Sequence, residues 1–223
     1  MKNRIINADC LKALKDIPSR SVDFVLTDPP YGVNYRDRSG RTIKNDADPC
    51  AILDAFYDIH RVLKDDALCV SFYGWQAVDG FMGAWRHAGF TPVDHIVWRK
   101  QYASSSRFVN RVHEQAYVLA KGRPNRPVQP FDDVQPWAYS GNRSHPTEKD
   151  VRILKPVIET FTKPGALVLD PFSGSGSTAV AAALAGRNYL GIELEEKYCR
   201  IAERRLAGVR RHLAFTTRET VAA

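Results

Sequence analysis

The sequence predicts an α/β fold in which helices cover both faces of a mostly parallel central sheet. Two short apolar runs, Val22–Thr27 and residues 166–170, have the pattern of strands buried on both sides. Strand and helix patterns then alternate through the second half of the chain, and a glycine-rich turn at residues 171–177 joins a strand to a helix. Alternation of this kind is typical of a parallel sheet covered by helices.

The first part of the chain is expected to hold two strands. Arg4–Asn7 predicts a short strand, and a helix over residues 10–17 follows it and ends at Pro18. The strand Val22–Thr27 stops before Pro29 and Pro30, which have no amide hydrogen to donate to a sheet. The sheet must therefore end there, and a rigid loop begins.

The middle of the chain mixes regular elements with irregular segments. Residues 35–48 are polar without apolar periodicity, which predicts a mobile loop. A helix follows, because five apolar residues recur at helical spacing: Ile52, Leu53, Phe56, Ile59 and Leu63. The next expected elements are a strand over residues 67–73, a helix over 76–87, and strands over 93–98 and 115–120.

The last part of the chain predicts a regular alternation of helices and strands. A helix follows residues 145–149, and Pro156 inside it predicts a kink. Its apolar residues share one face: Val151, Leu154, Val157, Ile158 and Phe161. A strand over 166–170, a turn and helix over 174–186, a strand over 189–193 and a helix over 195–206 follow. The basic tail beyond Val209, with Arg204 and Arg205 before it, is interpreted as an ordinary solvated helix end.

Composition limits the class of protein. The 223 residues carry 32 Lys and Arg against 25 Asp and Glu, a formal charge of +7, and 44% are hydrophobic. This composition excludes intrinsic disorder and suits an anionic partner such as nucleic acid. No apolar run approaches the ~20 residues of a membrane span, and no apolar signal segment follows Met1.

The cysteines predict neither disulfides nor a metal site. The four of them are scattered and lack closely spaced histidine partners. They are interpreted as reduced thiols of a cytoplasmic protein that binds no metal, and their positions are Cys10, Cys50, Cys69 and Cys199.

The glycine-rich turn is typical of a nucleotide-like cofactor site. A strand that ends in Asp170 enters a turn with Gly174 and Gly176, and a helix of small residues follows. Glu193 comes 19 residues after Gly174, at the end of the next strand, where a carboxylate can bind ribose hydroxyls. Two enzyme classes fit this pattern, namely nicotinamide-dependent dehydrogenases and S-adenosylmethionine enzymes.

The tetrapeptide Asp28-Pro29-Pro30-Tyr31 separates these two classes. The lone pair of an aromatic amine is delocalised into its ring, so such an amine is a poor nucleophile. Acceptors on both N–H groups, the Asp28 carboxylate and the Pro29 carbonyl, would free the lone pair to face an electrophilic methyl group. Tyr31 offers a flat face on which an extruded base can stack. Dehydrogenase chemistry gives no reason for this tetrapeptide, so methyl transfer is favoured.

Three motifs in one order carry a family resemblance. With residues 28–31, 145–149 and 170–177 in sequence, the chain resembles the DNA amino-methyltransferases, which methylate adenine N6 or cytosine N4. Within them it resembles the beta group, a circular permutation in which the catalytic tetrapeptide precedes the cofactor glycines. The similarity extends from about Ile5 to Leu206. It implies a Rossmann-like S-adenosylmethionine-dependent methyltransferase fold, S-adenosyl-L-methionine as the cofactor and double-stranded DNA as the partner.

The resemblance also implies roles for individual residues. The catalytic loop is Asp28, Pro29, Pro30 and Tyr31, and Asp28 also meets the cofactor's ammonium group. Asp9 and Cys10 lie near the cofactor's adenine, and Glu193 binds its ribose hydroxyls. The residues implied around its methionine part are Thr147, Glu148, Lys149, Asp170, Phe172, Ser173, Gly174, Ser175 and Gly176.

DNA contacts are expected in two basic segments. Residues 99–126 hold seven basic residues and one acid, interleaved with aromatic residues, which predicts phosphate anchoring with some base reading. The chain is expected to form one methyltransferase domain over residues 1–223. The basic residues fall in its least regular part, around 99–145, which is the natural place for a short target-recognition insertion. The loop after the tetrapeptide is also basic. The predicted contacts are Arg36, Arg38, Arg99, Lys100, Arg107 and Arg111.

The sequence therefore predicts a site-specific DNA methyltransferase that forms N6-methyladenine on a flipped base. An aspartate at position 28 favours adenine, and cytosine N4 methylation is the first alternative. A non-catalytic DNA-binding protein on the same fold is the second. Resemblance to the beta group also predicts a homodimer.

Overall fold

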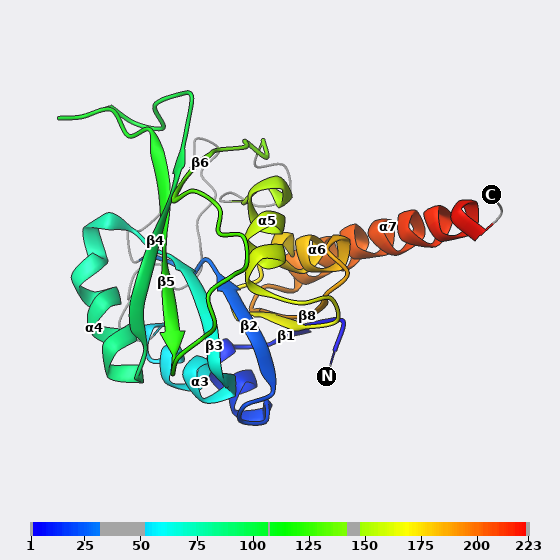
Figure 1. The fold of residues 1–223 in the computed structure, drawn as a ribbon, viewed down its shortest axis with the longest axis horizontal. Helices are drawn as coiled ribbons and strands as arrows, with labels where there is room; N and C mark the ends of the chain where they lie inside the picture. The colour runs from blue at the N-terminus through cyan, green and yellow to red at the C-terminus, as the bar shows by residue number, and fades with distance from the viewer. Residues whose placement is uncertain (1, 32–51, 107, 142–147, 222–223) are drawn as a thin grey trace.

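The computed structural model describes residues 2–31, 52–106, 108–141 and 148–221, without the side chains of 216–221. Its described strands form one sheet in the order β1-β8-β7-β2-β3-β5-β4-β6 (Figure 1). Every described strand runs in the same direction except β5, which pairs antiparallel with both β3 and β4. The strands are β1 Arg4–Asn7, β2 Val22–Thr27, β3 Leu63–Phe72, β4 Thr91–Arg99, β5 His113–Lys121, β6 Val134–Pro136, β7 Leu167–Asp170 and β8 Asn188–Glu193.

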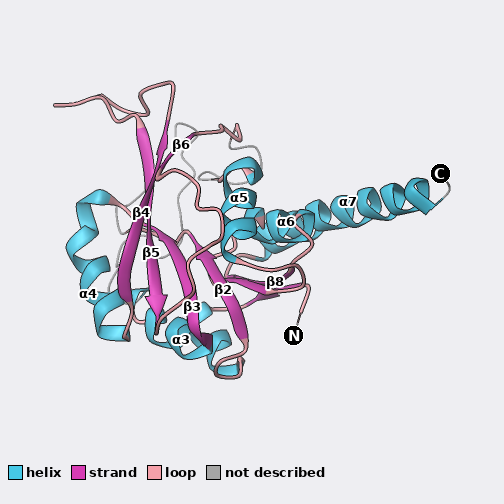
Figure 2. Ribbon diagram, in the orientation of Figure 1, coloured by secondary structure: helices cyan, strands magenta, loops and turns pink. Residues whose placement is uncertain are grey.

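Helices lie on both sides of this sheet (Figure 2). The helices, including two 3-10 turns labelled η, are α1 Cys10–Ala13, η1 Leu14–Asp16, α3 Ala55–Val62, η2 Trp75–Ala77, α4 Val78–Ala88, α5 Val151–Phe161, α6 Ser177–Leu184 and α7 Glu196–Val221.

Two hydrophobic cores fill the space between the helices and the sheet. On one face, Phe56 of α3 and Trp85 of α4 pack in a cluster with Val25 of β2. On the other face, Leu154 of α5 packs in a cluster with Phe24 of β2. Neighbouring residues of β2 thus point to opposite cores, as the period-2 geometry of a strand requires. Because both faces are buried, the strand is a nearly continuous apolar run.

The connections diverge at the boundary between β2 and β7. These strands are neighbours, with Phe24 paired to Val168. From β7 the chain crosses through α6 to β8 on one side, whereas from β2 it continues through α3 to β3 on the other side. A point where crossovers leave in opposite directions opens a crevice at the carboxyl ends of the strands, and ligands bind there in open α/β sheets.

The predicted fold class is confirmed, and three details differ. The helix predicted over residues 10–17 is divided into α1 and η1. β6 was not predicted, because its three residues form a strand only by pairing with β4. The last helix was predicted over 195–206, but α7 continues to Val221 and extends away from the sheet (Figure 1). The predicted loop at 35–48 lies outside the described residues.

No described helix, α7 included, has a stretch that is both long and apolar enough to cross a membrane.

Candidate active site

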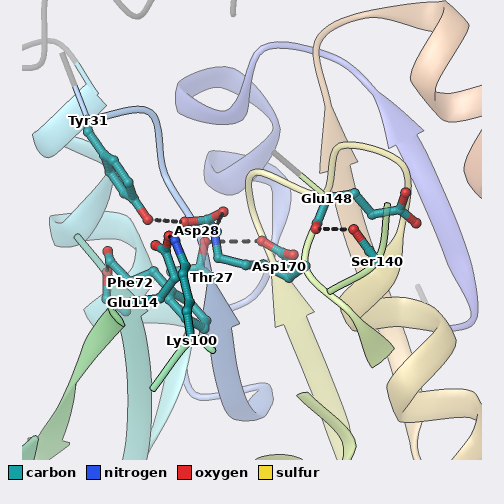
Figure 3. Close-up of polar contacts among 11 residues, drawn as sticks. Thr27, Asp28, Tyr31, Phe72, Lys100, Glu114, Ser140, Glu148 and Asp170 are labelled. Carbon is teal, nitrogen blue, oxygen red and sulfur yellow. Dashed lines mark hydrogen bonds and ion pairs between the residues drawn. The ribbon is translucent and has the colours of Figure 1, made fainter. Parts of the chain in front are cut away.

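Two motifs distant in sequence meet at the carboxyl edge of the sheet. Thr27 ends β2 and its hydroxyl donates a hydrogen bond of 3.0 Å to Asp170 Oδ1 at the end of β7 (Figure 3). Both side chains are buried. Asp28 follows Thr27 directly, so the rigid tetrapeptide begins beside the strand that feeds the glycine-rich turn. The sequence predicted this meeting of motifs, but it did not single out the Thr27 hydroxyl that joins them.

The Asp28 carboxylate is held from two sides. Lys149 Nζ pairs with its Oδ2, and the Tyr31 hydroxyl donates to its Oδ1. Lys149 is buried, and its ammonium group lies 4.9 Å from the centre of the Phe72 ring. Burial alone would lower the pKa of Lys149, but the neighbouring carboxylates of Asp28 and Glu114 raise it above its ordinary value. Lys149 therefore stays protonated and fixes the orientation of Asp28.

Asp170 is a buried carboxyl group near its point of half-ionisation at neutral pH. Burial raises the pKa of Asp170 to about 7 against an ordinary value of 3.8, and the nearby Asp28 charge acts in the same direction. Hydrogen bonds from the Thr27 hydroxyl and from the Phe172 amide, at 3.1 Å, oppose this shift because they favour the charged form. A cation placed beside Asp170 would favour its ionisation.

The glycine-rich turn is tied to the end of β8 by Glu193. The Gly174 amide donates to Glu193 Oε2 at 2.8 Å, and the Glu195 amide donates to Oε1 at 2.7 Å. Gly176 has a φ of 81°, and a Cβ there would lie 2.7 Å from the Cβ of Ala202 in α7. Only glycine fits this position, both for its conformation and for its space.

An unpartnered polar atom lies inside the turn. Among the described residues, Ser173 Oγ is one of three buried side-chain polar atoms without a hydrogen-bond partner. Buried hydroxyl groups are normally satisfied, so an orphaned one beside a glycine turn marks a position where a ligand atom can bond.

The end of β1 completes the row of carboxyl ends. Asn7 pairs with Glu193 in register, and the Asn7 side-chain Nδ2 donates a hydrogen bond to the Glu193 carbonyl at 3.0 Å. Asp9 follows as the N-cap of α1 and accepts from the Leu11 amide at 2.9 Å. Burial and the Asp9 charge raise the pKa of Cys10 to about 12. Cys10 is therefore a neutral thiol that can pack against a ligand but cannot act as a nucleophile.

Together these groups fit S-adenosyl-L-methionine. Asp9, Asp28, Asp170 and Glu193 bring acidic side chains to the carboxyl edge of the sheet, and Lys149 pairs with Asp28. A cationic ligand with ribose hydroxyls matches this set of groups. Gly176 begins α6 without a side-chain cap, and a helix N-terminus of this kind suits a nucleotide-like ligand.

Comparison with known proteins agrees with this geometry. The DNA methylase family matches residues 22–204, which is most of the chain. The chain belongs to the DNA methylase family. Its substrate class is therefore DNA, and the prediction of an amino-methyltransferase is confirmed at the level of this family.

Two relatives align with nearly the whole methylase. YubD of Escherichia coli (strain K12), named as a methylase, is 55% identical over 94% of this chain and 92% of its own length. The DNA adenine methyltransferase YhdJ of the same organism is 28% identical over 91% of this chain and 82% of its own.

Solved structures share the fold at low identity. The complex of M1.HpyAVI with S-adenosylmethionine superposes with a TM-score of 0.73 at 24% identity, over 91% of this chain and 98% of that one. The cytosine-N4-specific PvuII DNA methyltransferase gives a TM-score of 0.73 at 16% identity, over 92% of this chain and 86% of that one. These likenesses confirm the predicted S-adenosylmethionine-dependent methyltransferase fold, and the family match supports the predicted cofactor.

Arg205 of the methylase has a structural position that the sequence analysis missed. Its guanidinium Nη1 bonds the Ser175 carbonyl at 2.8 Å and the Ser177 hydroxyl at 3.1 Å, and it pairs with Glu148 at 3.1 Å. The interpretation of Arg205 as part of a solvated helix end was therefore wrong. Arg205 comes three residues after Ala202, about one turn of α7, and this spacing is the signal that places it on the helix face that meets the glycine turn.

Lys100 is also not where the sequence placed it. It was predicted to contact DNA, but its side chain is buried and paired with Glu114 in β5. Its charge is already neutralised inside the protein, so it cannot anchor a phosphate from this position. Arg99 is exposed and Arg111 half-buried. Arg36, Arg38, Arg107 and Thr147 lie outside the described residues.

Proposed function

We propose that this methylase transfers a methyl group from S-adenosyl-L-methionine to the exocyclic N6 of adenine in double-stranded DNA. The observation that carries the proposal is the position of Asp28. Its carboxylate is fixed by Lys149 and Tyr31 next to the buried Asp170, at the switch point between β2 and β7. The order of the motifs, with the tetrapeptide before the glycine turn, supports membership of the beta group.

The tetrapeptide supplies the acceptors for the amine. The bound cofactor supplies an electrophilic methyl group on a sulfonium. Asp28 accepts one N–H of the exocyclic amine, which its carboxylate can do alongside its bonds to Lys149 and Tyr31, since it has about four acceptor positions. The Pro29 carbonyl accepts the other N–H. The amine lone pair would then be free to attack the methyl carbon, whose bond to the sulfonium sulfur would break and leave the neutral thioether S-adenosyl-L-homocysteine, while Asp28 would accept the proton that the nitrogen loses.

The cofactor-binding role falls to the crevice residues. Gly174 and Gly176 let the ligand approach the backbone, and Ser173 Oγ offers an unsatisfied donor and acceptor. Glu193 and Asp9 accept hydrogen bonds from hydroxyl groups of the cofactor, and Asp170 lies opposite a cationic group of the cofactor. Glu148 and Phe172 are assigned to the walls of the same site.

The target base is read after extrusion from the duplex. An exocyclic amine inside a duplex cannot reach Asp28, so the nucleotide must flip out. Tyr31 is half-buried, and its ring lies edge-on to Phe81 at 6.3 Å between ring centres. Gly74 leaves room for it, because a Cβ there would lie 2.9 Å from Tyr31 Cβ. Tyr31 is thereby supported as a stacking platform.

The choice of adenine rests on the aspartate at position 28 and is supported by the relative YhdJ, which is named as a DNA adenine methyltransferase. Cytosine N4 is the second candidate, because a cytosine-N4-specific enzyme shares the fold. Mass spectrometry of nucleosides from DNA methylated in vitro separates the two. N6-methyladenine supports the proposal, and N4-methylcytosine overturns the choice of base.

Two other functions have direct tests. A non-catalytic DNA-binding protein would leave DNA unmodified in the same experiment. A dehydrogenase would bind a nicotinamide cofactor tightly, and a fluorescence titration with NADH measures this; we expect no binding.

Arg36, Arg38, Arg99, Arg107 and Arg111 stay proposed DNA contacts, and a homodimer stays proposed as the active species. Full activity of a species with monomeric mass in light scattering would contradict the dimer.

A further inference from the structure

The loop between β4 and β5 is a finger, defined here by its described residues 100–106 and 108–112. β4 runs parallel to β2, so the finger leaves the sheet at the carboxyl edge that carries Asp28 and Asp170. It projects beyond the ends of β4 and β5 (Figure 1). The finger and the proposed methyl-transfer site thus belong to one edge of the molecule.

Hydrogen bonds hold the two sides of the finger together. The Lys100 amide donates to the Val112 carbonyl at 2.7 Å, and Ser104 and Arg111 are joined by a bond of 2.9 Å. A bridge between Ser106 and Asn110 closes the hairpin. Phe108 and Val109 therefore lie at the end of the hairpin, between the paired residues Ser106 and Asn110.

The tip is apolar and exposed to solvent. Phe108 is fully exposed and Val109 is 71% exposed. An aromatic side chain held in water at the end of a hairpin makes no packing contribution to the fold, so it is available to contact a partner.

The root of the finger is anchored next to the site. Arg111 lies with its guanidinium carbon 4.9 Å from the centre of the Trp75 ring, just beyond the carboxyl end of β3. Lys100 pairs with Glu114 and lies 5.3 Å from the Trp137 ring centre. Glu114 in turn raises the pKa of Lys149, the partner of Asp28. A rigid root thus connects the finger to the catalytic tetrapeptide.

The charge of the finger fits DNA as its partner. Residues 99–112 hold no acidic residue and, besides Lys100, whose charge Glu114 neutralises, three arginines: Arg99, Arg107 and Arg111. The finger projects past the ends of β4 and β5 while its root stays at the sheet, so the tip can contact a duplex that lies along this edge.

We propose that Phe108, with Val109 beside it, enters the duplex next to the target nucleotide and fills the space that the flipped base leaves. This inference rests on the proposed function and adds the means of extrusion to it. Apolar side chains that wedge between bases are a known way to offset the cost of unstacking, which is a few kcal/mol. An aromatic ring can also stack on the exposed neighbouring base.

The test compares matched and mismatched DNA. Sequencing of DNA methylated by the chain identifies its site, and two synthetic duplexes are made with that site, one paired normally and one mismatched opposite the target base. We expect Phe108→Ala to lower kcat/KM on the paired duplex about 10- to 100-fold. The mismatch should restore most of this loss, since the target base is then already unpaired.

Val128→Ala is the matched control. Val128 is also almost fully exposed, but it lies in the segment that follows β5, away from the finger. We expect this variant to behave like the wild type on both duplexes, and both variants to bind S-adenosyl-L-methionine as the wild type does. 2-Aminopurine at the target position reports base opening independently. Its fluorescence in the protein–DNA complex should be lower with Phe108→Ala than with the wild type, and should be unchanged with Val128→Ala.

Two results overturn the inference. One is wild-type kcat/KM for Phe108→Ala on the paired duplex. The other is a loss that the mismatch does not restore, which would assign Phe108 to general DNA affinity. A wild-type chain that methylates no DNA at all overturns the proposed function instead, and this inference with it.

Discussion

Asp170 joins the two halves of the site through its charge state. It accepts from the Thr27 hydroxyl and the Phe172 amide, yet burial keeps its pKa near neutrality. At neutral pH the folded chain without ligand therefore holds Asp170 in both charge states, protonated and ionised. A cationic ligand favours the ionised form, so cofactor binding and proton release are coupled at this residue.

Asp170→Asn should change how stability depends on pH. The pKa of Asp170 is raised on folding from 3.8 to about 7, so its contribution to stability is complete below pH 3.8 and is lost as pH rises through 7. Between pH 5 and 8 the wild type should lose about 2–3 kcal/mol of unfolding free energy relative to Asp170→Asn. Urea denaturation of both proteins at the two pH values measures this; parallel pH curves would contradict the assignment.

Gly176→Ala tests the fit of the turn against α7. Gly176 and Gly186 both have a positive φ, of 81° and 70°, but a Cβ at 186 meets nothing within 4 Å, whereas one at 176 meets Ala202 at 2.7 Å. Gly186→Ala should cost about 1–2 kcal/mol of stability through its backbone alone. Gly176→Ala should cost a further ~1–3 kcal/mol.

Calorimetry with S-adenosyl-L-methionine completes this comparison. The affinity for S-adenosyl-L-methionine should fall for Gly176→Ala and stay unchanged for Gly186→Ala. The cofactor is proposed to lie against the turn that holds Gly176 and not against the turn that holds Gly186. Equal effects of the two substitutions on stability and on affinity would contradict the proposed role of Gly176.

At the level of elements, α7 packs against the glycine-rich turn and holds it in place. Its first turns bury Tyr198, Cys199, Ala202 and Leu206. Arg205 reaches from the same stretch to the turn before α6 and to Glu148, which lies just before α5. Burial lowers the pKa of Arg205, and the Glu148 charge opposes this. The ion pair therefore connects three segments of the chain around the cofactor crevice.

Arg205→Met should destabilise the fold by about 3 kcal/mol, because it leaves the buried Glu148 carboxylate without its cation. Arg211→Met, at an exposed position of the same helix, should change stability by less than about 0.5 kcal/mol. The double variant Glu148→Gln with Arg205→Met should lose less than the sum of the single losses. Additive losses measured by urea denaturation would show that the pair is not coupled.

For the whole molecule, the sequence predicted the sheet and the meeting of residues 28–31 with the glycine-rich turn because both rest on local patterns. Apolar runs mark β2 and β7, and each ends in a polar motif whose chemistry is readable. The position of Arg205 and the burial of Lys100 could not be read in this way. A basic residue in a basic segment indicates surface, and only tertiary packing brings Glu148 or Glu114 to neutralise it.

The length of α7 shows the same limit. The pattern predicted that the helix ends at residue 206, whereas the Ala, Leu and Arg residues that follow have enough helix propensity to continue it. The three-residue β6 depends wholly on its pairing with β4, which no local pattern contains.

Methyl transfer by Asp28→Ala tests the central claim most directly, namely that this carboxylate at the β2–β7 switch point activates a nucleobase amine. With radiolabelled S-adenosyl-L-methionine and a DNA duplex that carries the target site, the account predicts a loss of transfer of at least about 100-fold. DNA affinity and cooperative unfolding should be retained, which shows that the variant is folded. Transfer at the wild-type rate by a folded Asp28→Ala protein would contradict the account.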